Sequence, residues 1–148
     1  MTESKAKRMQ VVLVLADRNE QEAGRALAKY RAQVDTEIQQ LQQLDEYSAH
    51  YLQTYSERKM NVRPEELIAY SQFIHRLGEA RKEQRSRIER MQSSLLKLQN
   101  NWQVAHHRRE AIKDLIARLE KEETLIFEKR EQKEMDELVV QNYLRYQE

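Results

Sequence analysis

Apolar residues alternate at spacings of three and four along two long stretches of this chain, and the segment between them holds its only proline. A seven-residue repeat sustained over six or more heptads is typical of α-helical coiled coils. The first stretch contains Leu13, Ala16, Ala23, Leu27, Tyr30, Val34, Leu41, Leu44, Tyr51 and Tyr55. The second contains Leu67, Tyr70, Ile74, Leu77, Ile88, Met91, Leu95, Leu98, Trp102, Ala105, Ile112, Ile116, Leu119 and Ile126. The pattern predicts two long helices that pack along these stripes.

Polar residues interrupt both stripes without shifting the repeat. They are Glu20, Glu37 and Ser48 in the first stripe, and Arg81, Gln84, Arg109 and Glu123 in the second. Two glycines and one proline in 148 residues leave almost no turn chemistry for strands or short helices. With 34% of the residues charged, a rounded core is not expected either.

The charge balance, the cysteine content and the short apolar runs exclude several classes of partner and site. Lysine and arginine total 26 and aspartate and glutamate total 25, so the net basic field on which nucleic-acid binding relies is missing. The chain has no cysteine, which rules out disulfides and thiolate metal sites. Its longest apolar run, Val11 to Ala16, is far shorter than the roughly 20 residues that a membrane span needs. We therefore expect a cytoplasmic protein without nucleic-acid partners.

The expected fold is all-α, a long two-helix antiparallel coiled-coil hairpin with unequal arms. We predict helix one over about 5–57, a turn over about 58–64 and helix two over about 64–143, within a single coiled-coil domain of residues 1–148. Pro64 followed by two glutamates suits the first turn of a helix. A turn centred near residue 61 would place Leu13 near Arg109, and Ala23 near Leu98 and Trp102.

Gly24 has two interpretations in this scheme. The small Ala23 and Gly24 would leave room for the Trp102 indole, or the glycine would merely be tolerated at a cost of about 1 kcal/mol.

Helix two outlasts helix one, so its last part would lack a partner. The segment past Leu119 would span on the order of 40 Å, with an apolar stripe facing water. The residues of this stripe are Ile112, Ile116, Leu119, Ile126, Met135 and Leu138. The segment from Glu120 to Glu137 also holds eight acidic and four basic residues, which we interpret as ordinary helix exterior. The unpaired segment predicts an interaction or self-association surface.

No catalytic or cofactor motif is present in the sequence. Phosphate-binding and dinucleotide-binding loops need clustered glycines, and this chain has two isolated ones. The only candidate metal ligands, His50, His75, His106 and His107, do not provide the three or four ligands of a zinc site, although His106 could meet Glu110 one turn on. We expect no enzyme activity, cofactor, metal or small-molecule substrate.

Aromatic residues gather on both sides of the predicted turn. Tyr51, Tyr55 and Tyr70 fall on the stripes, whereas Tyr47 and Phe73 fall beside them. Tyr47 continues a row formed by Gln40 and Leu44, and Phe73 is followed at helical spacing by Leu77, Ala80 and Gln84. These rows form either a patch that a partner covers or a widened part of the core.

Three segments resemble the FliJ family of flagellar protein-export components. They are Leu67–Leu77, which includes Tyr70, Gln72, Phe73 and Ile74; Asn101–Trp102; and Gln132–Glu137, which reads Gln-Lys-Glu-Met-Asp-Glu. Their order and spacing match together, and the similarity covers most of the chain.

The resemblance implies a non-catalytic stalk that promotes assembly of the flagellar export ATPase hexamer (FliI-like). It also implies binding to the cytoplasmic domain of the membrane export gate (FlhA-like) and to substrate-specific export chaperones, at the inner membrane of the flagellar base. Carried over by position, the gate-binding residues are Gln40, Leu44, Tyr47, Tyr51, Phe73, Leu77, Ala80 and Gln84; the family pattern can show histidine where this chain has Gln84. The ATPase-facing helix ends correspond to Leu13, Leu119, Ile126, Lys133, Met135 and Asp136.

Two alternatives share the predicted fold. A holdase-type chaperone or a structural spacer would use exposed apolar helix ends without a dedicated ATPase. The equivalent stalk of a virulence secretion system would work by the same mechanism as the flagellar one.

Overall fold

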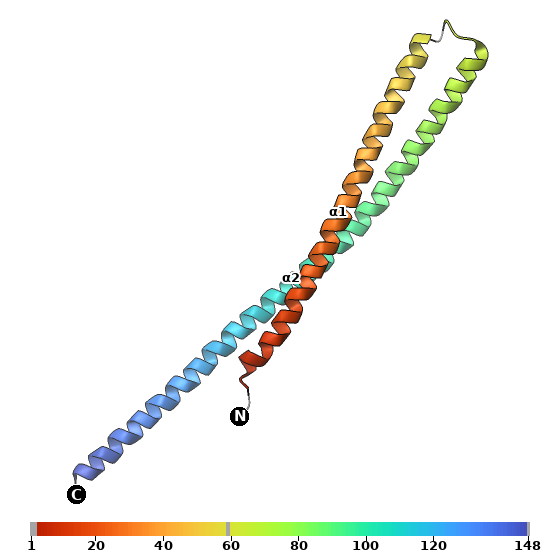
Figure 1. The fold of residues 1–148 in the computed structure, drawn as a ribbon. Helices are drawn as coiled ribbons and strands as arrows, with labels where there is room; N and C mark the ends of the chain where they lie inside the picture. Colours follow the sequence, from red (N-terminus) through yellow and green to blue (C-terminus); the bar gives the residue numbers. More distant parts are fainter. Residues whose placement is uncertain (1–2, 59, 148) are drawn as a thin grey trace. The chain divides into compact units, whose positions relative to one another are not determined.

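The computed structural model describes residues 3–58 and 60–147, and it consists of two α-helices (Figure 1). Helix α1 spans Lys5–Arg58 and helix α2 spans Pro64–Tyr146. No strand occurs in the described residues, and the helices pack extensively against each other in opposite directions. The predicted all-α, antiparallel two-helix hairpin is confirmed.

Local sequence determines where each helix begins. Ser4 caps α1: its hydroxyl accepts a hydrogen bond from the Lys7 amide at 3.2 Å, and its carbonyl accepts one from the Arg8 amide at 3.1 Å. At the start of α2 the Arg63 carbonyl accepts bonds from the amides of Glu66 at 3.0 Å and Leu67 at 3.2 Å. Pro64 thus stands at the first helical position, where its missing amide proton costs nothing.

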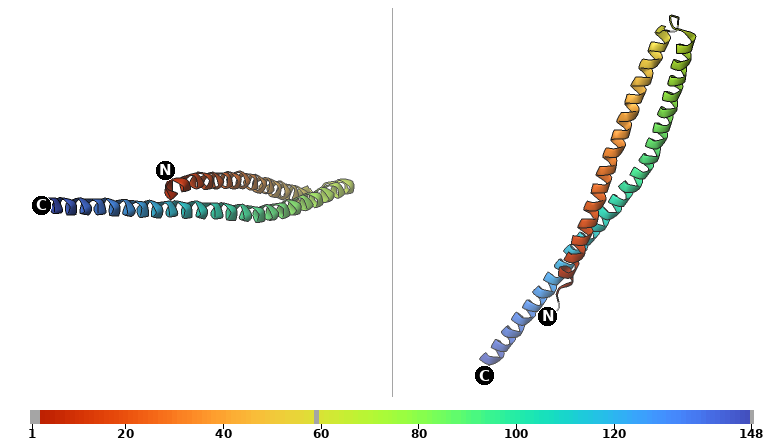
Figure 2. Two further views of the ribbon diagram at one scale, coloured as in Figure 1. Left: turned by 90° about the horizontal axis from the view of Figure 1, so that it is seen from below. Right: turned by 45° about the vertical axis from the view of Figure 1, so that its right-hand side comes forward.

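The chain divides into two compact units, which we describe separately. The terminal unit comprises Met1–Glu22 with Gln103–Glu148, and the turn unit comprises Ala23–Trp102. In each, a segment of α1 lies antiparallel beside a segment of α2, which the two views of Figure 2 also show. The expectation of a single domain stays a prediction.

The buried residues of both units lie on the predicted stripes. The buried apolar side chains are Ala6, Ala16, Val34, Leu77, Ile88 and Ile116. Ala6 lies one heptad before Leu13, so the stripe of α1 begins earlier than the sequence indicated. Most other stripe residues are half-buried, as expected when a single helix covers only one side of its neighbour.

The register of the helices matches the predicted one at some contacts and is displaced by about one helical turn at others. Glu37 contacts Gln84 as a turn centred on residue 61 would give, whereas Glu20 contacts His106 and Asp45 contacts Arg81, each about one turn further along α2. Arg109 lies beside Asp17 and Glu20, so the predicted neighbourhood of Leu13 is displaced by about one turn of α1 at this contact. The displacement arises because a repeated apolar pattern fits several alignments and does not by itself determine which α2 residue lies opposite each α1 residue.

The indole of Trp102 does lie against Gly24. A β-carbon built on Gly24 would lie 3.5 Å from both Cδ1 and Nε1 of the indole, which is ordinary van der Waals contact. Around Gly78 nothing lies within 4 Å of such an atom. Gly24 is therefore a contact position, with space for a methyl group but not for a larger side chain in the same direction.

Helix α1 covers α2 only up to Glu123. The Oε1 atom of Glu123 accepts a hydrogen bond from the Ala6 amide at 3.4 Å, and every residue from 124 to 147 is exposed. In the predicted exposed stripe, Ile116 is instead buried and Ile112 and Leu119 are half-buried against α1. Ile126, Met135 and Leu138 are 54–64% exposed. The uncovered segment of α2 thus begins at residue 124.

Candidate partner-binding surfaces and the polar layers that position them

The polar interruptions of the two stripes meet each other across the helix interface. Glu37 receives the side-chain amide of Gln84, with Nε2 2.5 Å from Oε2 and 3.0 Å from the Glu37 carbonyl oxygen. Ser48, only 2% exposed, lies 3.4 Å from Nη1 of Arg81. Arg81 also contacts Asp45 at 2.6 Å. We call these contacts, and the equivalent one in the terminal unit, the polar layers.

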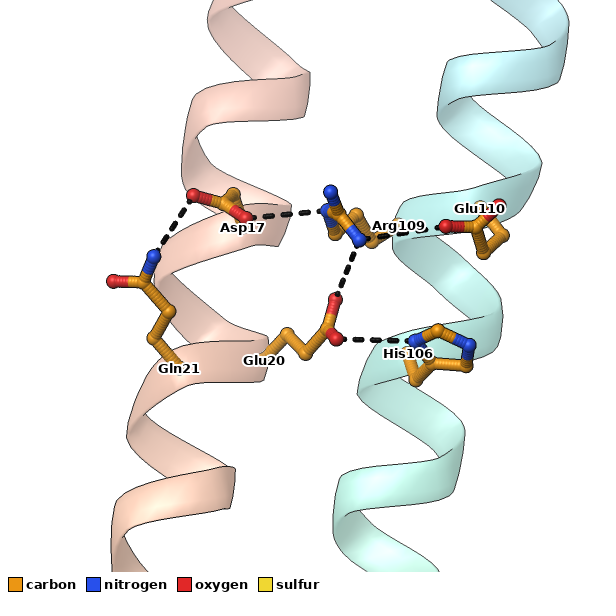
Figure 3. Close-up of polar contacts among 6 residues, drawn as sticks. All are labelled: Asp17, Glu20, Gln21, His106, Arg109 and Glu110. Atoms are coloured by element: carbon orange, nitrogen blue, oxygen red, sulfur yellow. Dashed lines mark hydrogen bonds and ion pairs between the residues drawn. The ribbon is translucent and has the colours of Figure 1, made fainter.

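In the terminal unit the polar layer belongs to a network of six residues, in which Gln21 contacts Asp17 and Glu110 contacts Arg109 (Figure 3). Glu20 Oε1 lies 3.0 Å from Nδ1 of His106, and Glu20 Oε2 lies 3.4 Å from Nη1 of Arg109. Arg109 Nε also contacts Asp17 at 3.1 Å. Glu20 Oε2 is buried and has no hydrogen bond of good geometry. The ion pair with Arg109 therefore offsets the free-energy cost of removing this oxygen from water. His106, which could meet Glu110 one turn on, thus contacts Glu20 across the helices.

Aromatic rings form a continuous cluster in the turn unit. The ring centroids of Tyr47 and Tyr51 are 4.9 Å apart, and those of Tyr51 and Phe73 are 4.7 Å apart. Tyr70 lies 6.2 Å from Tyr51 and 6.4 Å from Tyr55. These separations fall in the range preferred by interacting rings. We call these five residues the aromatic cluster.

Two shallow hollows adjoin the aromatic cluster. One, of about 280 Å³, is lined by Tyr51, Ala69, Tyr70 and Phe73. The other, of about 390 Å³, is lined by Gln40, Gln43, Leu44 and Tyr47. Tyr47 itself is 50% exposed. The cluster thus offers a partner apolar rings with open space beside them.

The residues predicted to bind the export gate separate into two groups. Gln40, Leu44, Tyr47, Tyr51 and Phe73 lie in or beside the aromatic cluster. Ala80 is exposed, Leu77 is buried with 8% exposure, and Gln84 is engaged with Glu37 in a polar layer. A partner that docks without opening the helices therefore meets the first group and Ala80, but not the buried Leu77. Ala69 and Gln43 also line the hollows, and no feature of the sequence pattern distinguishes them.

The residues predicted for the ATPase-facing ends all lie in the terminal unit. Leu13 and Leu119 are half-buried, and Leu119 lines a hollow between α1 and α2. Ile126, Lys133, Met135 and Asp136 are exposed on the uncovered segment of α2. Among the described residues no group of three or more histidine, aspartate or glutamate side chains could hold a metal ion.

A family model for the flagellar FliJ protein matches residues 4–148. The chain belongs to this family. The FliJ family is a non-catalytic component of flagellar protein export, so the flagellar assignment now rests on nearly the whole chain instead of three segments. No curated protein and no solved structure matched the sequence. None of the helices, over their described residues, is long and apolar enough to cross a membrane.

The tyrosine pair of the cluster has a measurable electrostatic signature. The hydroxyl–hydroxyl hydrogen bond with Tyr47, 3.5 Å long, is the main cause that raises the pKa of Tyr51 above its ordinary value of 10.0. Because the pKa of Tyr51 is raised in the folded state, its uncharged phenol stabilises the fold. This stabilisation is fully present below the unfolded-state pKa and is lost as the pH rises through the folded-state pKa. Tyr51 is therefore uncharged at neutral pH and compatible with an apolar partner.

We predict that Tyr47→Phe lowers the pKa of Tyr51 toward 10.0, because the substitution keeps the ring and removes the hydroxyl. Titration of ¹³C-labelled tyrosine by NMR measures this shift. Tyr30→Phe, at a distant stripe position, serves as the control. An unchanged Tyr51 midpoint in Tyr47→Phe would contradict the assignment.

We also predict that Arg109→Leu destabilises the fold by roughly 1–2 kcal/mol, because it leaves the carboxylate of Glu20, 15% exposed, without its countercharge. The double variant Glu20→Leu with Arg109→Leu should recover much of the loss. Urea unfolding followed by circular dichroism measures both. Arg90→Leu, at an exposed position, is the matched control. Equal effects at Arg90 and Arg109 would refute the prediction.

Proposed function

We propose that this FliJ-family protein is a non-catalytic stalk and chaperone of the flagellar export apparatus. In this proposal it promotes ring assembly of the export ATPase and links the ATPase to the cytoplasmic domain of the membrane export gate. It also receives substrate-specific export chaperones and works in the cytoplasm at the inner membrane. The observation that carries the proposal is the presence of two separate exposed apolar surfaces on a chain of this family.

The first surface, the aromatic cluster, is the proposed gate-binding site. Half-exposed aromatic residues beside hollows are the usual anchors of protein interfaces, because their rings bury a large area at a small entropic cost. Tyr47 and Phe73 come from different helices and are both linked to Tyr51 by ring contacts. The helix pairing therefore holds the anchors in place before the gate domain binds, which lowers the ordering cost of association.

The second surface, the uncovered segment of α2, is the proposed ATPase-facing element. It presents Ile126, Met135 and Leu138 to solvent among charged residues, as helices that dock into grooves of partner proteins do. A helix that lacks a neighbour over this length gains stability by docking, since an isolated helix is marginal in water. The half-buried Leu13 and Leu119 belong to the adjoining paired part of the same unit.

A holdase-type chaperone is the second candidate function. The consecutive Leu125, Ile126 and Phe127 are 49–62% exposed and would grip unfolded clients without sequence selectivity. Client selectivity separates the two candidates. A holdase suppresses aggregation of unrelated proteins, whereas a stalk acts on its own ATPase.

We predict that the purified protein increases ring formation and ATP turnover of the export ATPase from the same organism. Negative-stain microscopy and a phosphate-release assay measure the two effects. Substitution of both Ile126 and Met135 by glutamate should abolish the stimulation and preserve helix content, because both residues are exposed. The control is Leu96→Glu, in the turn unit and 62% exposed. No stimulation by the wild-type protein would remove the ATPase role.

We predict that Tyr47→Ala with Phe73→Ala weakens binding to the gate domain about tenfold or more, as expected when two aromatic anchors are truncated. Isothermal titration calorimetry measures the affinity. Leu77 is left intact because its burial would mix a loss of stability into the result. Leu96→Ala is the control. Unchanged affinity in the double variant would exclude the aromatic cluster as the gate site.

A further inference from the structure

Helix α2 carries a second row of heptad-spaced residues that α1 does not cover. The row alternates at spacings of four and three over the last part of the helix, entirely within the terminal unit. It consists of Val104, Arg108, Ala111, Leu115, Arg118, Glu122, Leu125, Lys129, Gln132, Asp136, Val139, Tyr143 and Tyr146, all exposed. We call this row the outer stripe. Seven of its thirteen residues are apolar, and a row at this spacing over six heptads can form a seam with a second helix when its polar residues meet complementary partners.

Apolar residues occupy the two ends of the outer stripe, and charged residues occupy its middle. Leu115 is 39% exposed, Val139 66% and Tyr143 63%. Apolar side chains this exposed at both ends of one stripe favour a partner that is itself apolar at both ends. A second copy of the same stripe, running in the opposite direction, meets that requirement.

We propose that the outer stripe forms a symmetric dimer in which the α2 helices of two copies pair antiparallel, with Leu125 of one copy opposite Lys129 of the other. In this register Leu115 faces Val139 of the second copy, and Ala111 faces its Tyr143. Arg118 faces Asp136 of the second copy with opposite charge. Because the arrangement is two-fold symmetric, each of these pairs occurs twice.

Two further layers are also complementary. Gln132 faces Glu122 of the second copy and can donate a hydrogen bond to its carboxylate. Arg108 faces Tyr146 of the second copy, and a guanidinium is attracted to an aromatic face. A parallel pair would instead place Arg108, Arg118, Glu122, Lys129 and Asp136 each against its own copy, with like charges in five layers. The charge pattern therefore selects the antiparallel dimer.

A hollow between α1 and α2 adjoins the proposed interface. Its volume is about 450 Å³, and it is lined by Lys5, Arg8, Met9, Val12, Leu115 and Leu119. Leu115 belongs to both the hollow and the outer stripe, so the helix of a second copy lying on Leu115 would also cover this apolar hollow. The stretch of that helix next to Leu119, residues 131–137, has four acidic residues and one basic residue, a net charge opposite to that of Lys5 and Arg8 at the rim. The helix of a second copy would therefore match both the apolar lining of the hollow and the positive charge at its rim.

Sedimentation equilibrium of the full chain tests the dimer. The wild type should show a concentration-dependent mass that approaches twice 17.9 kDa. Arg118→Glu and Asp136→Arg should each weaken self-association about tenfold or more, because each places like charges in two layers. The double variant should restore dimerisation. Both positions are exposed, so helix content measured by circular dichroism should not change.

Two results would overturn the dimer. One is a wild-type mass that stays at a single chain up to high micromolar concentration. The other is a double variant as weak as the single variants, which would show that residues 118 and 136 do not face each other.

Disulfide trapping tests the direction of pairing, because the chain has no native cysteine. A mixture of Leu115→Cys and Val139→Cys chains should form a covalent dimer on mild oxidation, and neither variant alone should do so. Leu96→Cys, outside the outer stripe, is the control. Efficient self-linking of Val139→Cys would indicate a parallel pair and refute the proposed register.

Discussion

The polar layers decide how the two helices of this protein align. Leucine-like side chains at heptad positions pack almost equally well when one helix slides by a turn or a heptad along the other, so apolar packing alone leaves several registers close in energy. A slide would move Glu37 away from Gln84, and Glu20 away from Arg109, and would bury unpaired polar groups. Their desolvation cost, which the native contacts offset, favours one register. The aromatic cluster depends on that register, because Tyr51 belongs to α1 and Phe73 to α2.

The amino-acid pattern predicts the fold and the stripe residues, but it does not predict the alignment. Val34, Leu77, Ile88 and Ile116 are buried as the heptads indicate, because helical periodicity depends only on neighbours in the chain. The offset between the helices depends on which polar residues meet across the interface, and the predicted pairing was displaced by about one turn at Glu20 and Asp45. The polar interruptions of both stripes were an available signal for the alignment. They meet in pairs across the interface: Glu20 with Arg109, Glu37 with Gln84, and Ser48 with Arg81. The hollows beside the aromatic cluster depend on side-chain packing and carry no signature in the sequence.

Membership of the FliJ family and the geometry of the two units contribute different parts of the functional account. The family places the chain in flagellar protein export. The structure distinguishes exposed rings such as Tyr47 from stripe residues such as Leu77 and Gln84, which already have roles in holding the helices together. A surface used for docking and a seam used for stability are therefore separable by substitution, even though they share neighbouring residues. The outer stripe of α2 adds a third surface, whose charge order suits a second copy of the chain.

The claim that the polar layers determine register can be measured by pulsed electron–electron resonance between spin labels at Gln43→Cys and Lys82→Cys, both exposed positions within the turn unit. Dilution with unlabelled chains isolates the distance within one molecule. With the polar layers intact, we expect one narrow distance distribution. When Glu37, Gln84 and Arg81 are replaced by leucine and Ser48 by alanine, the chain should stay helical and the distribution should broaden or split into several distances. A single narrow distribution at the original distance in that variant would contradict the account.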